Sequence, residues 1–270
     1  MGRTYDTVSF LSDYGTQDEF VGVVKSVIRS IAPAAVVIDL THEVPPHDLR
    51  TAGLALVRSA QYLAPGVILA VVDPGVGTER RAVAIEVAGG AGVFVGPDNG
   101  LLASAVAMTG GAERAVELTS ADHQLTAPGP TFAGRDVFAP AAAHLCNGID
   151  LTDLGPEIDP ITLRPGILPL SEVTDAGVKA EVLWVDRFGN VQLNVDPDDI
   201  AFLGDRMRVG FGESGVRTAG VVRTYGDLKQ GQLGVIVDSY GLVSLAFDRM
   251  SAAGELRLRA GDAVNLEPLE

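Results

Sequence analysis

The chain has 270 residues, of which 47% are hydrophobic, so it can form one main domain with a substantial core and a smaller second domain. Its formal charge of −15 argues against nucleic-acid binding, which requires basic surface. No apolar run reaches the roughly 18 residues of a membrane span, and the N-terminus lacks the apolar core of a signal peptide. We therefore expect a soluble, cytoplasmic protein without membrane or nucleic-acid partners. Its single cysteine, Cys146, is expected to be a small buried side chain.

Strand-like and helical patterns alternate through the first half of the chain. They predict strands at residues 8–11, 36–40 and 67–72, and helices at 18–31 and 48–63. In the first helix the apolar side chains recur at helical spacing, and Thr16 with Glu19 forms a capping-box pattern. This alternation is typical of βαβ units around a mainly parallel sheet flanked by helices.

The pattern changes in the middle of the chain. Strands are predicted at residues 82–87 and 92–95, and a helix at 137–147 that Gly148 ends. Four prolines then interrupt residues 154–177, which show little periodicity and predict a linker. The expected organisation is an α/β domain at 1–155, a linker at 156–177 and a second domain at 178–270.

The second domain shows only short alternating segments separated by Gly and Asp turns. They predict strands at residues 179–185, 191–195, 206–211, 234–237 and 242–247. No long helical pattern lies between them, so a small all-β domain, an antiparallel barrel or sandwich, is expected.

Several unusual loops follow predicted strands of the first domain, where ligands of open α/β sheets bind. The loop DPGVGT places Asp73 on a tight turn after a very apolar strand, and Arg80 follows seven residues later. Asp73 is equally explained as a turn-capping residue or as a reactive carboxylate. The glycines do not form a nucleotide-phosphate motif, because Arg80 occupies the third glycine position of GxGxxG.

A second loop, THEVPPHD, is rich in possible metal ligands: Asp39, which precedes it, and His42, Glu43, His47 and Asp48. The spacing is not that of a metalloprotease helix, and the proline pair prevents one helical face from presenting both histidines. A structural turn with capping carboxylates is the favoured interpretation, and no metal site is predicted.

Five other segments carry candidate binding residues. SDYGT offers Asp13, a potential ligand for sugar hydroxyls, and PDNG offers Asn99. TFAGRD offers Phe132, which either stacks on a base or packs in the core. In the second domain DRFGN and the Ser239-Tyr240-Gly241 segment are turns first and ligand contacts second.

Six segments taken together, in order and spacing, resemble the S-adenosylmethionine hydroxide adenosyltransferases, the adenosine-forming S-adenosylmethionine hydrolases related to fluorinases and chlorinases. The segments are FLSDYGTQDEFVGVVK, DLTHEVPPHD, VVDPGVGTERRAV, VGPDNGLL, TFAGRDVFAPAAAHL and VDRFGNVQLN. The resemblance implies an N-terminal α/β domain and a C-terminal β-barrel. It also implies a homotrimer with active sites between subunits, S-adenosylmethionine as the substrate and no cofactor.

The resemblance also implies roles for individual residues. Asp73 and Arg80 match two members of the family's Asp, Arg and His reaction centre, whereas Ala133 stands where the family has its His. The remaining candidates would bind substrate: Asp13 at the ribose, Phe132 beside the nucleoside, Asp186, Asn190 and Ser239 at the methionine end, and His47, Asn99 and Tyr240 as further contacts.

Water attack on C5′ is the favoured reaction, and two alternatives stay open. A halogenase would form 5′-halo-adenosine, but an anionic Asp73 would repel a halide, and the short connection at residues 88–93 cannot contain the extra loop of fluorinases. A non-catalytic S-adenosylmethionine or nucleoside binder would explain Ala133, but the presence of both Asp73 and Arg80 weighs against it.

Overall fold

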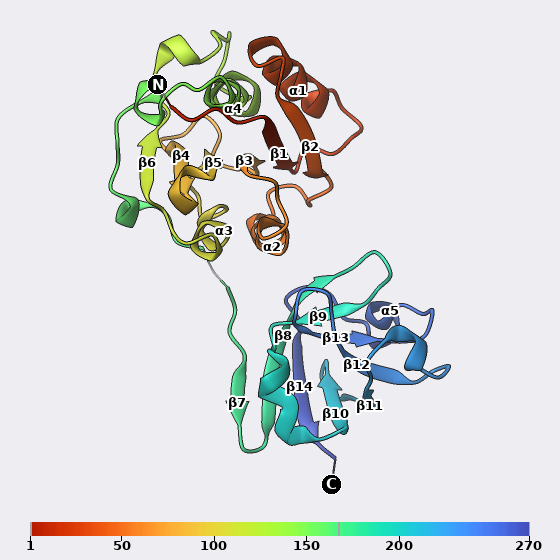
Figure 1. The fold of residues 1–270 in the computed structure, drawn as a ribbon. Helices are drawn as coiled ribbons and strands as arrows, with labels where there is room; N and C mark the ends of the chain where they lie inside the picture. The colour runs from red at the N-terminus through yellow and green to blue at the C-terminus, as the bar shows by residue number, and fades with distance from the viewer. Residues whose placement is uncertain (1, 167, 270) are drawn as a thin grey trace. The chain divides into compact units, whose positions relative to one another are not determined.

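The chain forms two compact units, Met1–Ile167 and Leu168–Glu270 (Figure 1). The computed structural model describes residues 2–166 and 168–269. The division between the units falls inside the segment 156–177 that the prolines mark as a linker. Part of that segment is regular, because it contains a short strand that belongs to the second unit.

A six-stranded sheet forms the centre of the first unit, in the order β2-β1-β3-β5-β4-β6. Its strands are β1 (Thr7–Ser12), β2 (Val36–Thr41), β3 (Gly66–Val71), β4 (Ala82–Val87), β5 (Gly92–Pro97) and β6 (Arg114–Glu117). β2, β1, β3 and β5 are parallel, as the βαβ pattern predicts, whereas β4 runs antiparallel to both β5 and β6. The sheet is therefore mixed. The connection between β4 and β5 is too short for the crossover of a dozen or more residues that parallel neighbours require.

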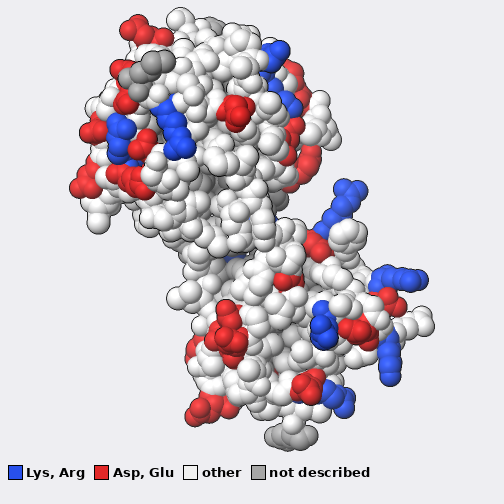
Figure 2. All heavy atoms as spheres, in the orientation of Figure 1, with Lys and Arg blue, Asp and Glu red and all other residues white. Residues whose placement is uncertain are grey.

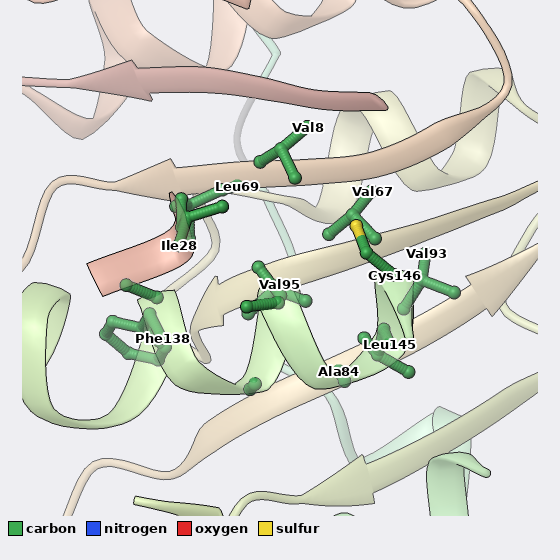
Figure 3. Close-up of a cluster of buried hydrophobic side chains, with 14 of the residues drawn as sticks. Val8, Ile28, Val67, Leu69, Ala84, Val93, Val95, Phe138, Leu145 and Cys146 are labelled. Atoms are coloured by element: carbon green, nitrogen blue, oxygen red, sulfur yellow. The ribbon is translucent and has the colours of Figure 1, made fainter. Parts of the chain in front are cut away.

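Helices cover both faces of this sheet (Figure 1). α1 (Phe20–Ile31) and α4 (Ala139–Cys146) contact each other on one face, and α2 (Leu49–Ala60) contacts α3 (Ala103–Met108) on the other. Figure 3 shows the apolar layer beneath α4, where Phe138 and Leu145 face strand residues such as Val95. Cys146 belongs to the same layer and is 6% exposed, which confirms the prediction of a buried thiol.

The ends of two helices differ from the sequence prediction. The prediction of a capping box before α1 is wrong. Glu19 makes no side-chain cap, and the Thr16 hydroxyl instead donates to Glu43 at 2.9 Å. The helix predicted at 137–147 begins earlier, with a π-helical turn, η3 (Gly134–Phe138), that leads into α4. The sequence did not predict α3 or β6, since their four to six residues carry too little periodic signal.

Seven strands of the second unit close into a barrel, in the order β14-β10-β11-β12-β13-β9-β8, with β8 pairing back to β14. The strands are β8 (Gly177–Val185), β9 (Val191–Leu193), β10 (Arg206–Phe211), β11 (Gly215–Val221), β12 (Leu233–Val237), β13 (Val243–Ala246) and β14 (Ala263–Pro268). The additional strand β7 (Glu172–Thr174) pairs with β8. The predicted barrel is correct, except that β11 and β12 are parallel and a short helix, α5 (Ala252–Leu256), precedes β14.

Short 3-10 turns connect these elements: η1 (Ala88–Gly90), η2 (Ala121–His123), η4 (Leu151–Leu154), η5 (Pro160–Thr162), η6 (Pro197–Leu203) and η7 (Tyr225–Asp227). Acidic side chains are distributed over the visible surface of both units, as the net charge leads one to expect (Figure 2). Within residues 2–166 and 168–269, no helix is long and apolar enough to cross a membrane.

Candidate active site

The loop after β3 holds Asp73 in the turn that its proline and glycines predict. The Val76 amide donates to the Asp73 carbonyl at 3.2 Å, and the Thr78 amide to the Gly75 carbonyl at 3.2 Å. Gly77 has φ +78°, a left-handed conformation that favours glycine. The turn leaves the Asp73 side chain only 6% exposed, so its carboxylate is largely shielded from bulk water.

Arg80 folds back onto Asp73 and binds both carboxylate oxygens. Its Nε donates to Oδ1 at 2.8 Å, and its Nη2 donates to Oδ2. The guanidinium also lies over the ring of buried Phe138, 5.2 Å from the ring centroid. Gly75 makes room for this arrangement, since a Cβ there would lie 3.1 Å from Cγ of Arg80. The bidentate geometry fixes the plane of the Asp73 carboxylate.

A cavity of about 270 Å³ opens beside this pair. Its lining residues are Asp13, Tyr14, Phe20, Pro46, His47, Asp73, Val76, Thr131, Phe132, Ala133 and Gly134. The loops after β1, β2 and β3 thus converge at one edge of the sheet, together with the segment before η3. Apolar walls with a few convergent polar groups are typical of small-molecule sites.

Three aromatic rings form one wall of the cavity. Phe132 contacts Tyr14 and Phe20 edge-on, with centroid distances of 5.6 and 5.0 Å, and Tyr14 lies 5.7 Å from Phe20. Arg135 supports Phe132 from 5.2 Å while its Nε donates to Asp136 at 2.6 Å, so the ion pair expected in TFAGRD is present. This wall presents aromatic, apolar surface that suits a heterocyclic base.

Burial raises the pKa of the Tyr14 hydroxyl well above its ordinary value, and the nearby carboxylates of Asp13 and Asp73 raise it further. Tyr14 is therefore a neutral hydrogen-bonding group at physiological pH. A Cβ at Gly134 would lie 2.1 Å from the Tyr14 hydroxyl oxygen. The absence of a side chain at Gly134 therefore leaves the space that this hydroxyl occupies.

Asp13 and His47, both candidates from the sequence, meet at the cavity. The His47 amide donates to Oδ2 of Asp13 at 2.9 Å, and His47 holds φ +68°, which is uncommon for a residue other than glycine. One carboxylate oxygen of Asp13 is thus fixed by the second loop. Asp13 has further lone pairs available for hydroxyl donors.

The other acidic residues of the second loop act as the favoured interpretation predicts. Asp48 caps α2, where it accepts from the Thr51 amide at 2.9 Å, and Glu43 accepts from Thr16. Asp39 is bound by Lys25 at 2.8 Å and lies 3.1 Å from His42. Burial raises the pKa of Asp39, but the hydrogen bond from Lys25 and the adjacent His42 ring outweigh burial and lower it overall.

Asn99 is not among the described residues that line the cavity. Its amide donates to the Val72 carbonyl at 2.9 Å, and its carbonyl accepts from the Leu101 amide at 3.2 Å. Since Val72 immediately precedes Asp73, Asn99 braces the strand end that carries the Asp73 carboxylate.

The candidates of the second unit lie in two turns of the barrel. Asp186 organises the turn between β8 and β9, where Oδ1 accepts from the Phe188 and Asn190 amides and Oδ2 accepts from the Asn190 side chain, each at 2.8 Å. Ser239 and Tyr240 lie in the turn between β12 and β13, which Asp238 caps at the Tyr240 amide at 2.8 Å. Both segments are turns, as the sequence predicts.

Side-chain contacts link strands β8 and β9 with the turn between β12 and β13. Gln192 in β9 donates to Asp238 at 2.6 Å, and Trp184 contacts the Tyr240 ring edge-on at 6.2 Å. Burial, and then the charges of Asp186 and Asp238, raise the pKa of Tyr225. Of the four candidates, Tyr240 is thus the one whose ring contacts strand β8, the strand that leads into the Asp186 turn.

Sequence reasoning missed several residues of both groups. Tyr14 lies in the SDYGT motif and Gly134 in the TFAGRD motif, but no local pattern distinguishes either of them from an ordinary turn residue. Phe20 read as part of the apolar face of α1, although it is 37% exposed and lines the cavity. Asp238 and Trp184 carried no motif at all, because their role depends on which barrel strands are neighbours.

Comparison with known protein families places both units in one family. Residues 8–155 match the N-terminal domain of the SAM hydroxide adenosyltransferases, and residues 180–265 match their C-terminal domain. The chain is 45% identical to an (R)-S-adenosyl-L-methionine hydrolase of Salinispora tropica over 96% of this chain and 97% of that one. It is 44% identical to the protein of the same name from Thermus thermophilus, over 96% and 98%.

More distant relatives and solved structures agree with this placement. A fluorinase of an Actinoplanes species is 27% identical over 96% of each chain. A conserved protein from Thermotoga maritima has a crystal structure that superimposes with a TM-score of 0.89, at 35% identity and over 96% of this chain and 99% of that one.

Proposed function

Because the chain belongs to the SAM hydroxide adenosyltransferase family, we propose that it hydrolyses S-adenosyl-L-methionine to adenosine and L-methionine by attack of water on the ribose C5′. The observation that carries this proposal is the Asp73–Arg80 pair, whose carboxylate lines an aromatic cavity that Asp13 also lines. Such a pair provides an oriented proton acceptor at a water-poor site.

Asp73 accepts the proton of the attacking water in the proposed mechanism. Arg80 uses one acceptor position on each carboxylate oxygen, and each oxygen has another lone pair with which to hold water. Because the plane of the carboxylate is fixed, the water that it holds is oriented toward C5′. Orientation of this kind provides much of the rate advantage of an enzyme-bound reaction. The guanidinium stabilises the hydroxide character that develops as the O–H bond weakens.

The leaving group needs no general acid. As the water oxygen bonds to C5′, the C5′–S bond breaks and its electron pair stays on sulfur, so the positive sulfonium becomes the neutral thioether of methionine. The proton from water passes to Asp73 and then to solvent. No metal or redox cofactor is required for these steps, and none is proposed.

Substrate contacts follow from the two groups of residues. Asp13 would hold the ribose hydroxyls and Phe132 would lie beside the adenine, with His47 as a neighbouring contact. Asn99 would act by bracing the strand end before Asp73. Asp186, Asn190, Ser239 and Tyr240 would bind the polar methionine end. We propose a cytoplasmic homotrimer with active sites between subunits, which light scattering on the purified protein would test.

Ala133 removes one imidazole from the wall of this cavity relative to the family pattern. A single general acid or base contributes about 10²- to 10⁴-fold to a rate. The proposed reaction therefore proceeds through Asp73 and Arg80, more slowly than with a histidine at that position.

The Asp73→Asn variant tests the proposal. The amide keeps the shape of the side chain but is a poor proton acceptor, so adenosine formation should fall by about 10²- to 10⁴-fold while substrate binding changes little. Chromatography of adenosine and methionine measures the rate, and calorimetry measures binding. Asp150→Asn is the control, because it weakens the 3.2 Å contact with Arg114 elsewhere in the same unit. An unchanged rate in Asp73→Asn would rule out the proposed role.

The same assay separates the alternative functions. Wild-type protein is incubated with the (R) and (S) sulfonium epimers separately, with and without chelator, and at several chloride concentrations. A 5′-chloro product would show halide as the nucleophile, whereas saturable binding without turnover would show a non-catalytic binder. Loss of activity on chelation would contradict the metal-free mechanism.

A further inference from the structure

A buried serine and histidine lie behind the cavity and are not used by the proposed chemistry. Oγ of Ser12, at the end of β1, is 2.8 Å from Nδ1 of His42. Ser12 is fully buried and His42 is 5% exposed. A polar pair this deeply enclosed costs free energy unless its hydrogen bonds are made, so its retention in the core calls for an explanation.

The opposite ring nitrogen of His42 faces a carboxylate. Nε2 lies 3.1 Å from Oδ1 of Asp39, while it has no well-aligned hydrogen-bond partner among the described residues. Asp39 also accepts from Lys25 of α1 at 2.8 Å. A proton on Nε2 is therefore favoured by the adjacent carboxylate, which leaves Nδ1 as the acceptor of the Ser12 hydroxyl.

With its hydroxyl proton directed at Nδ1 of His42, Ser12 Oγ can accept a hydrogen bond from a backbone amide of the following loop. The Tyr14 amide donates to Ser12 Oγ at 3.3 Å, and the Gly15 amide donates to the His42 carbonyl at 2.8 Å. The ring of His42 packs edge-on against Phe10 of β1, with centroids 4.6 Å apart. His42 is thus connected to the loop at residues 12–15 through both its side chain and its backbone.

The loop fixed in this way carries two cavity residues, Asp13 and Tyr14. Ser12 itself cannot act as a nucleophile, because it is fully buried and does not line the cavity. The Ser–His–Asp arrangement consequently resembles a hydrolytic triad only in composition. What these three residues can affect in the cavity is the position of the loop at residues 12–15.

We propose that His42 is a positioning residue that, held by Asp39, fixes Asp13 and Tyr14 through Ser12 so that they meet the nucleoside of the substrate. This inference rests on the proposed function, because it assigns the nucleoside to the cavity. Asp13 and Tyr14 are proposed to contact the nucleoside and not the reacting atoms, so their displacement weakens contacts made in the bound substrate as well as in the transition state. Loss of the Ser12–His42 contact should therefore appear mainly as weaker substrate binding.

Two substitutions at His42 separate positioning from packing. His42→Phe keeps the ring and its contact with Phe10 but removes the acceptor for Ser12, so kcat/KM should fall by about 10- to 100-fold, mostly through KM. His42→Asn places its carbonyl oxygen near the former Nδ1, and it should restore KM to within a few fold of wild type. His144→Phe is the control, since His144 is a half-buried histidine of the same unit whose ring contacts His123.

Ser12→Ala tests the same contact from the other side. It should raise KM as His42→Phe does, and the double variant should be no worse than either single variant, because both remove one interaction. Hydrogen–deuterium exchange should show faster exchange of the Tyr14 and Gly15 amides in His42→Phe but not in His144→Phe. If His42→Phe does not fold, Ser12→Ala and its exchange rates provide the test.

Folded variants with wild-type KM and wild-type exchange at residues 12–15 would overturn the inference, as would a His42→Asn variant as impaired as His42→Phe. The proposed function fails separately, when wild-type protein forms no adenosine. In that case amide exchange and adenosine affinity still report on the loop, because neither depends on turnover.

Discussion

Gly134 decides whether the aromatic wall of the cavity can form. A side chain at this position would lie 2.1 Å from the Tyr14 hydroxyl and 3.2 Å from the Phe132 ring. Tyr14 has little freedom to retreat, because it also packs against Phe10 and Phe20. The requirement for glycine is therefore steric and local to the cavity.

Gly134→Ala should lower substrate affinity by about tenfold or more and destabilise the protein by about 1–3 kcal/mol, since overpacking forces neighbours to move. The Tyr14→Phe change in the same chain should recover part of both losses by removing the clashing oxygen. Calorimetry with adenosine and thermal unfolding measure the two effects. Gly129→Ala is the control, because a Cβ there meets no atom within 4 Å. Equal affinities for wild type and Gly134→Ala would contradict this account.

A contact between two histidines connects helix α4, which carries His144, with the turn η2, which carries His123. The rings of His144 and His123 lie 4.8 Å apart, and His123 contacts Ser120 at 2.9 Å. Burial lowers the pKa of His144, and the neighbouring His123 lowers it further. The folded protein therefore resists protonation of His144 at a pH where the unfolded chain accepts it.

The consequence is a loss of stability on the acid side. Because the pKa is lowered in the folded state, the contribution of His144 is complete above the unfolded value of about 6.5 and decreases as pH falls through it. His144→Gln should flatten the fall in melting temperature between pH 7.5 and 5.5, and His123→Gln should flatten it less. Thermal unfolding across this range measures both, and parallel curves for all three proteins would argue against the histidine pair as the cause.

On the scale of the whole molecule, each unit has its own core. The first unit has an apolar cluster on each face of its sheet, and the second has a separate cluster inside the barrel. Apolar contacts of this kind provide most of the stability of a domain. Leu170, which lies at the start of the second unit, is 90% exposed.

Fragments 1–166 and 168–270 should therefore fold independently. Each expressed alone should show cooperative thermal unfolding, and chymotrypsin should cut the intact chain near Leu168 and Leu170 before it degrades either unit. Circular dichroism and limited proteolysis provide the measurements. A fragment that unfolds without cooperativity would mean that its core depends on the other unit.

Local patterns of residues were sufficient to predict several elements of the fold and one turn of the site. Long apolar periodicity predicted α1 and α2, β-branched runs predicted β1 to β3, and the proline and glycine of DPGVGT predicted the turn at Asp73. The family resemblance rested on six such local segments in order. These signals are readable because neighbouring residues alone create them.

Which of these segments contact one another became clear from the folded chain. It paired β4 antiparallel to β5, replaced the Thr16–Glu19 cap with a contact to Glu43, and brought Tyr14, Phe20 and Phe132 into one wall. It also connected Ser12 to His42 across 30 positions of the chain. Contacts of this kind depend on strand order and loop direction, which local patterns do not encode.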